Sequence, residues 1–163
     1  MQKLTLEAAD KIADCIIACI KRNGFAPVAI SVVDDGGHVI VQKVMDGCSR
    51  VGIPQFAYSK AFTCIVQKAS SRDFRDKYTK GFSDNPAKYC QMVSMVNITE
   101  GKMAPFPGGV LILNETEVVG AVGVSGAAGD EDEYCAIRGV SEADLGLSFK
   151  PEIHCCTTMS DNF

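Results

Sequence analysis

Three polar residues in the first part of the chain are of types that carry acid–base chemistry. Asp34 and His38 flank a run of two glycines, and Lys60 follows in a helical pattern. Carboxylate, imidazole and amine groups can exchange protons with a reacting molecule when they converge. Together they would suit tautomerisation or hydrolysis of a small carbonyl or imine compound. The alternatives are local: the Asp34 carboxylate can cap the turn that follows it, and Lys60 can be a surface charge.

His38 has a second possible role, because neutral imidazole is a good ligand for iron and titrates near neutral pH. It directly follows Asp34-Asp35-Gly36-Gly37, a sequence that favours a tight turn between two strands. A histidine without a visible partner in the sequence is also commonly a polar neighbour of such a turn. The sequence therefore leaves three roles open for His38: iron ligand, proton carrier or turn residue.

A glycine-rich segment, residues 120–126, has the spacing G-x-x-G-x-x-G. It differs from the dinucleotide fingerprint G-x-G-x-x-G and lies in a predicted hairpin strand, so a Rossmann site is rejected. Glycines in a strand allow close approach of another backbone or of a ligand. Ser125 and Gly126 precede a predicted helix and could direct N–H groups at an anion. Tight packing of strand against helix explains the same glycines equally well.

The eight cysteines form no C-x-x-C pair and, with two histidines, no zinc pattern. Cys15 and Cys19 lie one helical turn apart, as on a buried helix face. The adjacent Cys155 and Cys156, beside His154, are the more reactive candidates, and this cluster could hold a metal or haem weakly. The remaining thiols are expected to be reduced and to act as small apolar residues.

The elements that must position these residues follow from periodicity and capping. Apolar spacing predicts helices from Thr5, Pro54, Asn85 and Asp130, the last with Glu133 as capping partner. The charged run 68–80 is expected to be a solvated helix surface. Two strand–turn–strand patterns, 28–41 and 110–124, predict antiparallel hairpins, and a short strand is expected before the second one. The predicted fold class is α+β: a five-stranded antiparallel sheet flanked by helices. The pattern weakens after Val140, so residues 1–140 are the predicted domain and 141–163 a tail or interface arm.

The composition limits the classes of partner. A chain of 163 residues with 47% hydrophobic and 22% charged residues suits one globular domain. A net charge of −4 argues against nucleic acid as a main partner. No apolar run is long enough for a membrane span or a signal peptide, so the expected location is the cytoplasm.

Three stretches taken together resemble the GlcG/HbpS family, the haem-degrading domain that includes the C-terminal domain of PduO-type proteins. They are SVVDDGGHVI at 31–40 continuing to MDG at 45–47, KAFT at 60–63, and PFPGGV at 105–110 followed by VGAVGVSG at 119–126 and DEDE at 130–133. The resemblance implies a profilin-like fold and assembly into homo-oligomers. It also implies haem binding in some members, redox or iron-linked sensing in others, and a link to small-molecule catabolism.

The resemblance implies a haem-binding or haem-sensing oligomer, with a small catabolic enzyme and a structural assembly subunit as alternatives. His38 would be the iron ligand. Val44 stands where the family usually has Arg, so a propionate or an acid substrate needs another cation, with Arg50, Lys43 and Lys60 as candidates. The expected ligand-binding set is His38, Arg50, Lys60, Gly108, Gly109, Ser125 and Gly126.

Overall fold

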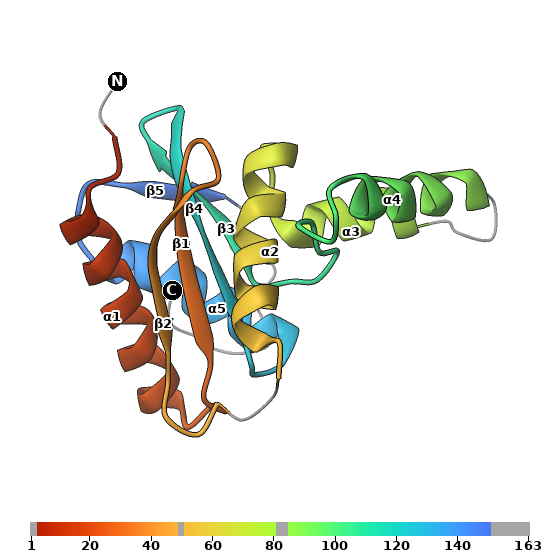
Figure 1. Ribbon diagram of the computed structural model, residues 1–163. Helices are drawn as coiled ribbons and strands as arrows, with labels where there is room; N and C mark the ends of the chain where they lie inside the picture. Colours follow the sequence, from red (N-terminus) through yellow and green to blue (C-terminus); the bar gives the residue numbers. More distant parts are fainter. Residues whose placement is uncertain (1–2, 49–50, 81–84, 151–163) are drawn as a thin grey trace.

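The computed structural model describes residues 3–48, 51–80 and 85–150. One antiparallel sheet with strand order β2-β1-β4-β3-β5 forms its centre, with helices on both faces (Figure 1). The strands are β1 (Ala29–Asp34), β2 (Val39–Val44), β3 (Gly109–Asn114), β4 (Glu117–Ser125) and β5 (Ser148–Lys150). The predicted α+β class, the five strands and both hairpins are confirmed.

The fifth strand is not where the sequence suggested. Residues 99–108, which precede β3, contain no strand, and β5 instead comes near the end of the chain. It pairs with the edge of β3, Leu111 lying opposite Lys150. Part of the segment 141–163 that was predicted as a tail or interface arm thus adds a strand to the sheet. His154, Cys155 and Cys156 lie outside the described residues.

Two helices cover one face of the sheet and one helix covers the other (Figure 1). Helices α1 (Leu6–Asn23) and α5 (Gly129–Glu142) share a core with Ile30 and Val32 of β1, whereas α2 (Ile53–Gln67) packs on Val33. This division follows from the alternation of side chains along a strand. The hydrophobic core is therefore split between the two faces.

Local signals place α1 as predicted. The Thr5 hydroxyl accepts a hydrogen bond from the Ala8 N–H at 3.2 Å, and Gly24 ends the helix with φ of 66°. The start of α5 differs from the prediction that Asp130 caps it with Glu133. The helix begins at Gly129, and the Glu131 carboxylate accepts from the Ala128 N–H at 2.9 Å. Glu133 is consequently released for a buried contact.

Helix α2 lies directly on the backbone of β4. A Cβ atom on Gly123 would overlap the carbonyl oxygen of Ala57 in α2. A Cβ atom on Gly120 would overlap the carbonyl oxygen of Val33 in the neighbouring strand β1. Glycine is needed at these positions because only hydrogen fits between the two backbones. Tight packing is therefore the role of these two glycines.

Helices α3 (Ser71–Thr79) and α4 (Pro86–Ile98) extend away from the sheet beside α2 (Figure 1). A separate small cluster of Phe74, Met92 and Met103 holds them. In the described residues, no helix is long and apolar enough to cross a membrane.

Candidate functional site

A cavity of about 630 Å³ opens where β4 ends, between α2, the loop before β3 and the start of α5. We call it the Lys60 cavity. Its wall consists of apolar, small and charged residues: Val51, Ile53, Phe56, Lys60, Arg75, Phe106, Pro107, Ser125, Gly126, Ala127, Ala128, Gly129, Asp130 and Asp132. The volume is in the range of small-molecule sites.

Lys60 and Asp132 form a buried ion pair in this wall. The Lys60 Nζ lies 2.8 Å from Asp132 Oδ2 and donates a second hydrogen bond of 2.8 Å to the carbonyl oxygen of Val124. The two side chains are only 5% and 2% exposed. The other carboxylate oxygen, Asp132 Oδ1, accepts from the Ala127 N–H at 3.1 Å. The pair therefore joins α2, the end of β4 and the first turn of α5.

Backbone geometry makes room for the Lys60 ammonium. Gly108 has φ of 123°, and a Cβ there would lie 2.6 Å from the Val124 oxygen and 2.9 Å from Lys60 Nζ. Gly126 has φ of 137°, and a Cβ there would lie 2.6 Å from the oxygen of Pro27. Both glycines adopt a conformation that other residues rarely reach. Gly108 thus allows the lysine to reach its partners, and Gly126 allows close approach of the Pro27 backbone.

Burial moves the pKa values of the pair toward each other. Desolvation lowers the pKa of Lys60, opposed by the charge and hydrogen bond of Asp132. Desolvation raises the pKa of Asp132, opposed by Lys60 and the Ala127 N–H. Both directions reflect the cost of holding a charge away from water. Proton transfer between the two groups is easier here than in water, and perturbed pairs of this kind are frequent at functional sites.

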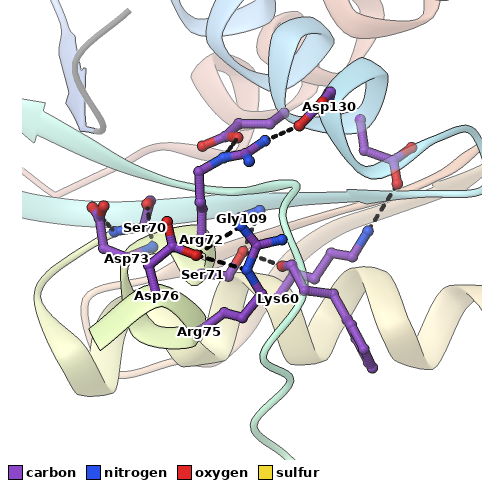
Figure 2. A network of polar contacts seen from close by, with 12 residues as sticks. Lys60, Ser70, Ser71, Arg72, Asp73, Arg75, Asp76, Gly109 and Asp130 are labelled. Carbon is purple, nitrogen blue, oxygen red and sulfur yellow. Dashed lines mark hydrogen bonds and ion pairs between the residues drawn. The ribbon is translucent and has the colours of Figure 1, made fainter. Parts of the chain in front are cut away.

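A second polar network fixes α3 against α5 at the side of the cavity (Figure 2). The Arg72 guanidinium bonds Asp130 and donates from Nε to Glu133 Oε2 at 2.5 Å, Glu133 being fully buried. The Ser71 hydroxyl donates to the Phe106 carbonyl oxygen at 2.6 Å and accepts from the Gly109 N–H at 2.8 Å. The charged run 68–80 was predicted to be a solvated surface. Arg72 departs from that prediction: its side chain is only 16% exposed, because it pairs with the buried Glu133.

An apolar groove of about 420 Å³ lies beside the Lys60 cavity. It runs between α2, α4 and residues 101–106, and its wall is Gln55, Phe56, Ser59, Tyr89, Met92, Val93, Val96, Asn97, Gly101, Met103, Ala104, Pro105 and Phe106. Phe56 and Phe106 belong to both cavities and contact each other edge to face, with ring centroids 6.4 Å apart. This aromatic pair forms the boundary between a polar and an apolar compartment.

The structure brings together only some of the predicted site residues. Lys60, Ser125 and Gly126 line the Lys60 cavity, and Gly108 lies where a Cβ atom would clash with the ammonium. Gly109 is packed against the backbone of Lys60 and the Cys64 thiol instead. Arg50 lies outside the described residues.

Asp34 and His38 lie at the opposite end of β1. In the pairing of β1 with β4, Asp34 is opposite Gly120 and Ala29 is opposite Ser125. Asp34 is therefore five residues, about 17 Å, along β1 from the end beside the Lys60 cavity. His38 is 82% exposed on its side chain, and Nδ1 lies 3.2 Å from Asp34 Oδ1. The Asp34 carboxylate also accepts from the N–H groups of Gly36 and His38, both at 2.9 Å. Asp34 thus acts as the turn cap that the sequence allowed.

Lys43 and Val44 lie on the edge strand β2. The Lys43 Nζ forms ion pairs with two residues of α1, Asp10 at 2.8 Å and Asp14 at 2.6 Å. Val44 is half exposed. Lys43 is therefore already paired on the face away from α2.

Sequence reasoning missed Asp132, Glu133 and Arg72 as buried residues. Asp130 and Glu133 were interpreted as helix-capping residues, and the acids at 130–133 otherwise only as part of the family motif. A signal was present: Asp132 and Glu133 precede the buried Ala136 and Ile137 by four residues, which places all four on one helix face. The Phe56–Phe106 contact had no such local signal.

The comparisons with known proteins agree with the fold. The family model described as haem degrading protein HbpS-like matches residues 4–141, so the chain belongs to this family. Protein GlcG of Escherichia coli strain K12 is 30% identical over 121 residues, which is 72% of this chain and 80% of that protein.

Solved structures are similar to this chain in fold. The crystal structure of HbpS has a TM-score of 0.71 at 27% identity, covering 87% of this chain and 91% of that one. The crystal structure of a PduOC:heme complex has a TM-score of 0.73 at 19% identity, covering 86% and 94% of the two chains.

Proposed function

We propose that this protein binds haem, with the macrocycle in the apolar groove between α2 and α4. Membership of the HbpS-like family supports the ligand, and a structural neighbour was crystallised with haem. The observation that carries the choice of site is the groove itself, because a porphyrin needs a largely apolar slot with few polar groups.

The side chains of the groove fit the chemical demands of haem. Iron takes sulfur, nitrogen or phenolate ligands, and the groove offers the thioethers of Met92 and Met103 and the hydroxyl of Tyr89. Bound haem would supply a redox-active iron. The role of the groove residues is to exclude water from the macrocycle and to present one of these ligand atoms.

The neighbouring Lys60 cavity provides cations for the haem propionates. Arg75 lines it and is 35% exposed, its guanidinium bonding Asp76 at 2.7 Å. A propionate passing the edge of Phe106 would compete with Asp76 for this guanidinium, a charge-assisted contact. Arg75 is therefore our candidate for the cation that the family usually supplies by an Arg at the position of Val44.

His38 is a separate proposal for the iron ligand, since it lines neither cavity. With 82% of its side chain exposed, it would need a second copy of the chain to enclose a haem. Replacing it separates the two proposals, because groove binding does not require this imidazole.

A haem titration of the purified apoprotein, followed at the Soret band, tests the proposal. Val93 lines the groove and Val66 lies elsewhere on α2, and both are partly exposed at 40% and 47%. We expect stoichiometric binding, a loss of at least about tenfold in affinity in Val93→Asp, and unchanged binding in Val66→Asp and His38→Ala. No Soret band, or a loss confined to His38→Ala, would overturn the groove proposal.

We also propose self-association, in keeping with the family resemblance. Helix α4 exposes Tyr89, Val93 and, at 80%, Ile98, which a second copy would cover. Light scattering of the haem-free protein checks this, and a monomer at all concentrations would contradict it.

The enzyme alternative now depends on different residues. Asp34 and His38 do not meet Lys60, whereas Asp132 does. A small-molecule activity is therefore proposed only for the Lys60 cavity.

A further inference from the structure

We propose that Lys60 and Asp132 form a reactive-amine site that condenses with a small neutral aldehyde or ketone to give an imine. The proposal rests on the buried pair and its cavity, and is independent of haem binding in the groove.

The amine is shielded from bulk water but faces a cavity. Lys60 is 5% exposed on its side chain, yet it lines a space of about 630 Å³. An ammonium has three N–H donors, and two of them are used by Val124 and Asp132. One N–H remains for a ligand in the cavity.

The charged groups next to Lys60 are already paired, which selects a neutral ligand at the Lys60 end of the cavity. Asp132 holds the ammonium, and Asp130 bonds Arg72. The start of α5, a favourable place for an anion, already carries its own acids at 130–132. An extra carboxylate would therefore meet negative charge, whereas a carbonyl compound brings none.

The apolar walls fit the remainder of such a compound. Ile53, Phe56, Phe106 and Pro107 line the same cavity as the amine. A short alkyl chain on these walls would hold the carbonyl carbon near Lys60 by burial of apolar surface.

The pair can supply both proton transfers that imine formation needs. Burial lowers the pKa of Lys60 and raises that of Asp132, so the ammonium can pass a proton to the carboxylate. The neutral amine then adds to the carbonyl carbon: a C–N bond forms, the C=O π bond breaks, and Asp132 relays a proton from the nitrogen to the alkoxide oxygen to give a carbinolamine. Asp132 then gives its proton to the hydroxyl group, which leaves as water while the C=N bond forms, so the product is a protonated imine beside the Asp132 carboxylate. The condensation needs no oxidant or reductant.

Reductive trapping with butanal and sodium cyanoborohydride tests the proposal on the unmodified protein at pH 7. Peptide mass spectrometry would give the initial alkylation rate at Lys60 and at the exposed Lys68 and Lys102 in the same sample. We expect Lys60 to react at least about tenfold faster, because its amine is deprotonated more readily. In urea this advantage should disappear.

A rate at Lys60 equal to or below that of the exposed lysines in the folded protein would overturn the proposal and leave a purely structural ion pair. The Val93→Asp variant separates this result from haem binding. It should lose haem affinity while keeping the fast alkylation of Lys60. Loss of the fast alkylation in a Val93→Asp variant that still unfolds cooperatively would count against an independent site.

Discussion

The Lys60 Nζ and the Asp132 Oδ2 lie 2.8 Å apart, and this contact joins residues of α2 and α5 that are 72 positions apart in sequence. Helix α2 covers one face of the sheet, and α5 lies with α1 on the other. The contact passes around the end of β4, where Lys60 also donates to the carbonyl oxygen of Val124. The pair therefore has both a chemical and a stabilising consequence.

Removal of one partner of this pair should strongly destabilise the protein. Lys60→Met leaves the buried Asp132 without its cation, and we expect the free energy of unfolding to fall by about 3–5 kcal/mol. Urea denaturation measures it. The double variant Lys60→Met/Asp132→Leu should lose less than the single variant, because no buried charge remains. A single variant as stable as the parent would show that Asp132 is already neutral.

Loss of Arg72 should loosen α3 more than the rest of the fold. Arg72→Met removes the bridge to the buried Glu133, and we expect a cost of about 3 kcal/mol. Hydrogen exchange should rise first in residues 71–79. Arg75→Met is the matched control, since its pair with Asp76 is partly exposed and contributes at most about 1 kcal/mol. Equal effects of the two changes would contradict the distinction.

The contact between α2 and β4 should not tolerate a methyl group. Gly123→Ala places Cβ against the backbone of Ala57, and we expect a loss of about 3 kcal/mol in urea denaturation because backbone must shift. Gly24→Ala is the control: nothing lies within 4 Å of its Cβ, and only the φ of 66° costs about 1 kcal/mol. A larger loss at Gly24 than at Gly123 would contradict the packing argument.

The turn at Asp34 should make stability depend on acid pH. Burial alone would raise the pKa of Asp34, but the N–H groups of His38 and Gly36 outweigh it, so the pKa lies below its ordinary value. The ionised form therefore favours folding at neutral pH, and this contribution disappears as pH falls through the lowered pKa.

Asp34→Asn removes this titration. It should be less stable than the parent at pH 7, and the difference should vanish as the pH falls through the lowered pKa. Unfolding in urea over a series of decreasing pH values checks this, with Asp35→Asn, one residue along the same exposed turn, as the control for charge loss. A difference that stays constant with pH would exclude the carboxylate as its cause.

The sequence determined the local structure of this protein, because capping, turns and periodicity act over a few residues. Thr5, Gly24, both hairpins and the Asp34 cap could be predicted for this reason. The motifs also determined family membership. Lys60, Ser125 and Gly126 could be named because they stand within those motifs.

Only the tertiary structure decided which of these residues meet. Asp34 and His38 are closer to Lys60 in sequence than Asp132 is, yet Asp132 is its partner because α5 returns past the end of β4. The same path of α5 buries Glu133 beside Arg72. The position of α4 next to α2 creates the apolar groove. Contacts between distant segments depend on how the two faces of the sheet are covered, and no local pattern of residues encodes that.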